Sequence, residues 1–148
     1  SIPGDRLGDL AVSPKSDNVE EFMAAATVAN RISGDTNAPS IIQLAVERCL
    51  DAQVDIPYYK KNAEDLYKIV TDAGFTAVVP QVAFYLWVKS PVADEKDLVD
   101  AATAERIIEV PGSAFACPGY IRLSFCISNE TIQRSAESFA KLGKKYFG

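Results

Sequence analysis

The sequence predicts an α+β fold, and a change in the spacing of its apolar residues carries that prediction. Up to Gly74, apolar residues mostly recur every three or four positions, as they do in amphipathic helices. Beyond Gly74, short segments with the two-residue period of β-strands alternate with further helices. A chain of 148 residues, 48% of them hydrophobic, is long enough to bury the core that such a fold requires.

The first part of the chain predicts one short strand and two helices. Residues 9–13 read as a strand, which Pro14 ends. The polar residues 16–18 begin an apolar helical stripe that lasts until Gly34. A second helix over residues 39–52 carries apolar side chains on more than one face, so we expect it to be well buried.

The remainder predicts a separate unit of mixed helices and strands. A long amphipathic helix of about five turns begins at Pro57 and ends at Gly74. This change in element order predicts two domains, residues 1–54 and 55–148. Within the second domain we expect strands at residues 76–79, 83–89, 107–110 and 120–127, the first two as a hairpin, and helices at 94–106 and from 128 onward.

Composition and charge exclude several classes of function. Fifteen Lys and Arg against 20 Asp and Glu give a net charge of −5, the wrong sign for collecting nucleic acid or anionic lipid, so we expect neither partner. No apolar run is long enough to span a membrane. Without histidine, the chain has no Ser-His or Cys-His nucleophile, and we expect no metal site. Its three cysteines, which lie among apolar neighbours, predict reduced thiols in or near the core of a cytoplasmic protein.

Arg122 is the most informative single residue. Strict alternation in residues 120–126 places three apolar side chains on one face of a strand and Arg122 on the other. A planar guanidinium on a rigid strand is suited to gripping a carboxylate through two parallel hydrogen bonds. The alternative is an arginine on a solvated sheet face.

Arg6 is a second candidate. It follows a Pro-Gly turn and precedes Gly8, where a bend in the backbone can aim its side chain at a phosphate. The alternative is an ordinary loop arginine.

Four motifs in order resemble the class I and II aminotransferases of fold type I, in particular aspartate aminotransferases. They are S-I-P-G-D-R-L-G at the start, A-F-Y-L from Ala83, V-P-G-S-A-F from Val110 and G-Y-I-R-L-S-F from Gly119, followed by a final helix. The resemblance spans essentially the whole chain. It implies that residues 1–54 end a large domain that binds pyridoxal 5′-phosphate (PLP), and that residues 55–148 form a small domain with a mixed or antiparallel sheet and packed helices.

The same resemblance implies the chemistry. The full-length protein would transfer an amino group between an amino acid and a 2-oxo acid, with Arg6 on the cofactor phosphate and Arg122 on the substrate α-carboxylate. The Schiff-base lysine is expected three residues before Ser1, so the chain would hold no catalytic residue and would be inactive alone. Family members are commonly homodimers, which makes three residues possible cross-subunit contacts: Arg31, Thr36 and Asn37.

Three alternatives stay open at this point. Lyases and cyclopropane-carboxylate synthases share the fold and both arginines, and some transcription regulators fuse an aminotransferase-like domain to a DNA-binding module. The third is a free-standing α+β ligand-binding domain. The sequence also departs from the family pattern at Asp9, at Val82 and in the short segment Ala116-Cys117-Pro118, so it does not predict which amino acid is the substrate.

Overall fold

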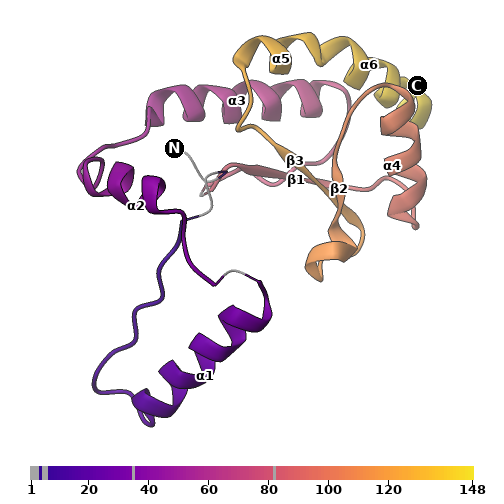
Figure 1. The fold of residues 1–148 in the computed structure, drawn as a ribbon. Coiled ribbons are helices and arrows are strands. Elements are labelled where there is room, and N and C mark those ends of the chain that lie inside the picture. Colours follow the sequence, from indigo (N-terminus) through magenta and orange to yellow (C-terminus); the bar gives the residue numbers. More distant parts are fainter. Residues whose placement is uncertain (1–3, 5–6, 35, 82) are drawn as a thin grey trace. The chain divides into compact units, whose positions relative to one another are not determined.

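The computed structural model describes residues 4, 7–34, 36–81 and 83–148, and the chain divides into two compact units, Ser1–Val54 and Asp55–Gly148. Helices and one small antiparallel sheet make up the fold, which confirms the predicted α+β class. In chain order the elements are α1 (Val19–Ile32), α2 (Ser40–Glu47), α3 (Ile56–Asp72), β1 (Tyr85–Lys89), α4 (Glu95–Ala104), β2 (Val110–Pro111), the 3-10 turn η2 (Gly112–Phe115), β3 (Tyr120–Ser124), α5 (Asn129–Arg134) and α6 (Ala136–Phe147) (Figure 1).

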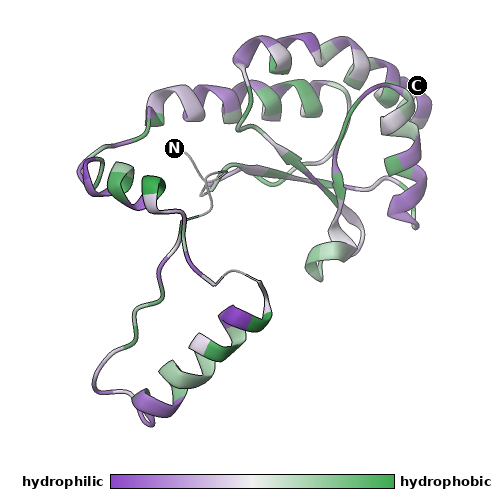
Figure 2. Ribbon diagram, viewed as in Figure 1, coloured by the Kyte–Doolittle hydropathy of each residue, from purple (hydrophilic) through white to green (hydrophobic). Residues whose placement is uncertain are grey.

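The first unit consists of α1 and α2 with their connections. Two glutamates in the first turn of α1 and Arg31 in its last turn complement the helix dipole. Both helices carry green, hydrophobic stretches in Figure 2. None of the described residues of this unit is buried, however, and Ile41 and Leu44 of α2 are 75% and 63% exposed. The apolar faces of these helices therefore have no core of their own within the unit.

Two expectations for this unit are wrong. Residues 9–13 form no strand, because the described part of the unit contains no second strand that could pair with their backbone groups. The helix expected over residues 39–52 ends at Glu47 and is not buried, since the unit offers nothing to cover its several apolar faces. The thiol of Cys49 is likewise exposed rather than packed.

The second unit begins with α3, whose ends are set by local interactions. The Asp55 carboxylate accepts a hydrogen bond from the Tyr58 backbone N–H at 3.0 Å, which caps the helix start. At the other end Gly74 adopts a φ of +96°, and a Cβ there would lie 2.8 Å from the Phe147 ring. The predicted five-turn helix is thus confirmed, with its stop at a position that requires glycine.

The sheet is antiparallel with the strand order β1-β3-β2. β3 lies in the centre, so that Arg122 pairs with Trp87 of β1 on one side and with Val110 of β2 on the other. The strand expected at residues 76–79 is reduced to a single bridge between Ala77 and Val88. β2 is only two residues long, so the sheet holds its edge through few backbone hydrogen bonds.

The core lies between this sheet and the helices α3, α5 and α6, which cover one of its faces (Figure 1). α4 contacts β2, β3 and α6 at the edge of the same unit. In β1 and β3 every second side chain is buried, and these side chains form the sheet side of the core. The buried apolar residues are Ala63, Leu66, Val70, Phe75, Leu86, Val88, Leu98, Ala101, Ala102, Ile107, Ile121, Leu123, Phe125, Ile132, Phe139 and Leu142.

A buried asparagine joins α3 to the chain that leaves β3. The Asn62 side chain is fully buried and donates hydrogen bonds to the carbonyl oxygens of Phe125 and Ile127, at 3.1 and 2.9 Å. Its own oxygen accepts a hydrogen bond from the Asn129 side chain at 2.9 Å. Because Asn62 takes up carbonyls that a neighbouring strand would otherwise use, β3 ends at Ser124, short of the expected Ile127.

Two further observations concern the described residues. None of their helices combines the length and the hydrophobicity that a membrane crossing needs. They also contain no group of three His, Cys, Asp or Glu side chains placed to hold a metal ion.

Replacing Asn62 by alanine should lower the free energy of unfolding by about 1–3 kcal/mol, because it leaves the Phe125 carbonyl without the Asn62 donor and leaves the Ile127 carbonyl with the Tyr58 hydroxyl alone. Urea denaturation measures this loss. Lys60→Ala removes a solvent-exposed ion pair two residues away on α3 and should change stability by less than about 0.5 kcal/mol. Equal stabilities for the two variants would contradict the assigned role of Asn62.

Candidate functional site

The face of the sheet opposite the helices carries Arg122. The burial of β3 alternates as predicted, with Ile121 and Leu123 in the core and Arg122 on the other face. In β1 the same alternation buries Leu86 and leaves its neighbours half-exposed on the face of Arg122. The register of β1 and β3 therefore surrounds the arginine with aromatic side chains.

Two aromatic rings pack against the guanidinium group. The Cζ atom of Arg122 lies 3.9 Å from the centre of the Tyr85 ring and 3.8 Å from the centre of the Phe115 ring. Phe115 in turn meets Trp87 edge to face, with ring centres 6.0 Å apart. Such cation–π contacts hold the arginine side chain in one place without using its N–H donors.

One donor of Arg122, the Nε–H group, lacks a partner among the described residues. Its Nε atom is buried and has no hydrogen-bond acceptor among the described residues. Nor does Arg122 form an ion pair with any carboxylate of those residues. A fixed, partly buried cation with an unused donor is a suitable binding group for an anion, and a carboxylate matches its planar shape.

The segment between β2 and β3 delivers Phe115 to this position. It forms the turn η2, seen as the short orange coil on the side of the sheet away from α3, α5 and α6 (Figure 1). A Cβ on Gly112 would lie 2.1 Å from the Cys117 carbonyl oxygen and 2.6 Å from that of Tyr120. The glycine of the V-P-G-S-A-F motif is therefore required, because the backbone folds back onto it.

Glu95 in the first turn of α4 ties both ends of this segment to the helix. Its side chain is buried, and its two oxygens accept hydrogen bonds from the backbone N–H groups of Ser113, at 2.8 Å, and of Gly119. Hydrogen bonds from the side chain and backbone of Ser113 hold the pKa of Glu95 below its ordinary value. From the sequence, Glu95 was one of several acids at a helix start, and its pattern did not distinguish it from its exposed neighbours.

The other predicted site residues lie elsewhere. Arg6 falls outside the described residues. Arg31 is exposed at the end of α1, and Thr36 and Asn37 are exposed in the connection to α2. The structure therefore brings Arg122 together with Tyr85 and Phe115, neither of which the sequence assigned to a site.

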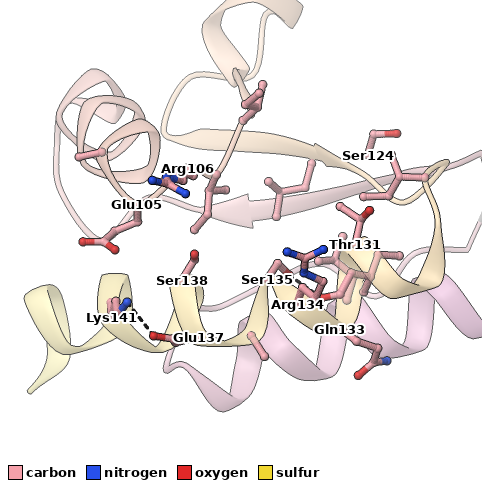
Figure 3. A pocket seen from close by; sticks show the side chains of 18 residues that line it. Glu105, Arg106, Ser124, Thr131, Gln133, Arg134, Ser135, Glu137, Ser138 and Lys141 are labelled. Atoms are coloured by element: carbon pink, nitrogen blue, oxygen red, sulfur yellow. Dashed lines mark hydrogen bonds and ion pairs between the residues drawn. The ribbon is translucent and has the colours of Figure 1, made fainter.

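A groove of about 1320 Å³ lies between the end of α4, the end of β3 and the helices α5 and α6 (Figure 3). Arg122 is not among its lining residues. The side chains that line the groove include both cationic and acidic groups, and Lys141 forms an ion pair with Glu137 at 2.8 Å.

Glu109 lies immediately before β2, and its pKa is shifted further than that of any other described residue. Both carboxylate oxygens are buried and have no partner among the described residues. Burial raises the pKa of Glu109 to about 7, because removing water disfavours the charged form. Val110, not Glu109, is the residue that pairs with Arg122.

Comparison with known proteins identifies the family. The family model described as "Aminotransferase class I and II" matches residues 1–139. The chain belongs to the class I and II aminotransferase family. The family depends on PLP, which is therefore the cofactor of the full-length protein.

Curated relatives agree with this membership. The chain is 31% identical to the aspartate/prephenate aminotransferase of Thermus thermophilus over 96% of its own length and 38% of that protein. It is 29% identical to the aspartate aminotransferase of Thermotoga maritima, over 93% of its length and 35% of that protein. The chain thus spans little more than a third of the relatives it matches.

Solved structures agree as well. An aminotransferase from Eubacterium rectale superposes with a TM-score of 0.83 at 35% identity, covering 99% of this chain and 37% of that one. The Thermus thermophilus aspartate aminotransferase with maleate gives a TM-score of 0.71 at 28% identity, covering 83% of this chain and 34% of that one. The observed fold is therefore that of the corresponding part of an aminotransferase.

The pKa of Glu109 predicts a pH-dependent stability. The folded pKa is raised from the ordinary value of 4.5 to about 7, so the favourable contribution of the protonated form is complete below pH 4.5 and is lost as the pH rises through about 7. Glu109→Gln keeps the shape and removes the charge. After allowance for partial solvent screening, this substitution should raise the free energy of unfolding by about 1–2 kcal/mol at pH 8 and change it little at pH 4.5. Thermal unfolding at both pH values measures this, and an equal gain at both would refute the assignment.

Proposed function

We propose that the full-length protein is a PLP-dependent aminotransferase that transfers an amino group between an amino acid and a 2-oxo acid, and that Arg122 binds the α-carboxylate of both. The observation that carries this proposal is the guanidinium of Arg122, held by two rings within 4 Å while its buried Nε lacks an acceptor. An incoming carboxylate would supply the missing acceptor.

The position of Arg122 on β3 explains why such a residue can orient a substrate. It sits in the central strand, paired on both sides, so the backbone that carries it cannot shift independently of the sheet. Gripping the carboxylate through two parallel hydrogen bonds would fix the direction of the adjacent Cα–H bond. The aromatic neighbours cover part of the guanidinium, and this lower local polarity would strengthen an ion pair formed there.

The cofactor supplies an electron sink for the charge that develops at Cα. Of the chain's own residues, we propose that Arg6 pairs with the cofactor phosphate, a role that rests on the resemblance of the S-I-P-G-D-R-L-G segment. A cationic side chain beside turn backbone suits a phosphate. The lysine that holds the cofactor is expected three residues before Ser1, and for that reason we expect residues 1–148 to be inactive alone.

The curated relatives named above are aminotransferases of aspartate, and in one case also of prephenate, by their names. Those compounds differ in their side chains, whereas amino acids and 2-oxo acids share the α-carboxylate that Arg122 would bind. The proposal therefore extends to the shared group and assigns no particular amino acid.

We further propose that residues 1–54 end the large domain and that residues 55–148 are the small domain. The absence of buried residues among those described in the first unit supports this division, because its apolar helices need a larger body to pack against. A cytoplasmic homodimer with Arg31, Thr36 and Asn37 at the subunit contact fits the same proposal, since all three side chains are exposed.

Replacing Arg122 by alanine in the full-length protein should raise the KM for the amino acid by on the order of 100-fold, because a charge-assisted bidentate contact contributes about 2–3 kcal/mol. Steady-state kinetics measure this change. The absorbance of bound cofactor should stay unchanged, since the substrate contact alone is removed. Wild-type kinetics in this variant would refute the carboxylate-binding role.

Arg6→Ala should act on the cofactor instead of the substrate. Loss of a phosphate contact weakens retention, so the variant should release PLP on dialysis faster than Arg122→Ala does, as read from absorbance. Adding excess PLP should restore most of the activity. Retention equal to that of the wild type would remove Arg6 from the phosphate site.

A further inference from the structure

We propose that Glu95 is a positioning residue for Arg122: by binding both ends of the connection between β2 and β3, its carboxylate holds Phe115 against the guanidinium. This inference rests on the proposed role of Arg122 as the carboxylate-binding group. It concerns a residue that does not touch the substrate itself.

The two hydrogen bonds of Glu95 lie on either side of Phe115 in the chain. One oxygen of Glu95 binds the N–H of Ser113, two residues before Phe115, and the other binds the N–H of Gly119, four residues after it. Phe115 lies at the exposed middle of the segment thus closed, with 44% of its surface accessible. The ends of the segment are fixed to α4, and the ring is carried between them.

Few other backbone contacts fix the connection between β2 and β3 to the rest of the unit. β2 contributes only two paired residues, and the hydrogen bond from the Cys117 N–H to the Gly112 carbonyl, at 2.9 Å, lies within the segment. An outside backbone contact is the Gly119 carbonyl, which accepts from the Ser90 N–H at 2.9 Å. Glu95 is therefore the side chain that ties the segment to α4 at both of its ends.

Glu95 lies on α4, a helix that is anchored in the core. Leu98, Ala101 and Ala102 are buried and anchor α4 in the core, so its first turn is a fixed support. The Asp94 side chain caps this turn by accepting from the Lys96 N–H at 3.0 Å. Capping the helix and clamping the segment are thus performed by two adjacent carboxylates, which can be varied separately.

The carboxylate of Glu95 is chemically suited to accept both hydrogen bonds. The two N–H donors bind different oxygens of Glu95, and a carboxylate has two acceptor oxygens whereas an amide has one. Glu95→Gln keeps the shape and one acceptor but turns an NH₂ group toward the other donor. Glu95→Ala removes both acceptors and leaves two backbone donors of the segment without a partner.

The test combines steady-state kinetics with acrylamide quenching of Trp87, both measured in the full-length protein. Glu95→Ala should raise the KM for the amino acid and the KM for the 2-oxo acid by the same factor, on the order of tenfold, with kcat within about twofold, because a misplaced Arg122 weakens binding of substrate and transition state alike. Glu95→Gln should raise both by less. Trp87 is the single tryptophan of the chain and meets the Phe115 ring, so acrylamide should quench it more strongly in both variants.

Asp94→Ala is the matched control, because it removes one carboxylate and one hydrogen bond from the same helical turn. It should lower stability to urea while both KM values and the quenching of Trp87 stay at wild-type values. If Glu95→Ala does not fold, the isosteric Glu95→Gln carries the test. Unchanged KM and quenching in the Glu95 variants, with KM raised in Arg122→Ala, would overturn the positioning role alone. Unchanged KM in Arg122→Ala would overturn the proposed function, and equal effects of Asp94→Ala would reduce Glu95 to a structural residue.

Discussion

The contact of the Arg122 guanidinium with the rings of Tyr85 and Phe115 is the interaction that the arrangement of this unit serves. A long cationic side chain on an open sheet face samples many rotamers, and the carboxylate binding that we propose for Arg122 would be weak from an ensemble of positions. Rings on both neighbouring segments limit that freedom, and they do so without competing for the N–H donors. The arginine is thereby ordered in the free protein, and this order would lower the entropy lost in the proposed binding of a carboxylate.

This contact needs three parts of the chain to be correctly placed, and each has a separate cause. β3 is fixed by its two strand neighbours and by the helices beneath it. Tyr85 is placed by the register of β1 against β3. Phe115 belongs to no strand, so its placement requires the tight backbone around Gly112 and the buried carboxylate of Glu95. Order in the site thus depends on a helix that contributes no group to it.

The sequence predicted those features that follow from local periodicity. The α+β class, the five-turn helix ending at Gly74 and the face occupied by Arg122 all depend on residues close together in the chain. The strand expected at residues 9–13 failed, as did burial of the helix after Pro39, because strand formation and burial require partners that periodicity cannot supply. The aromatic neighbours of Arg122 were missed for a related reason, since the pairing register that selects Tyr85 is a long-range property.

Glu95 illustrates the limit of such reasoning most clearly. An acid in the first turn of a helix is adequately explained by the helix dipole, and that explanation applies to its neighbours in the same turn. What separates Glu95 from them is burial, and a buried carboxylate is stable only where hydrogen bonds replace water. Here those hydrogen bonds come from backbone N–H groups, which every residue except proline possesses and which therefore leave no signature in the sequence. A side chain whose partners are backbone atoms is recognised only once the path of the chain is known.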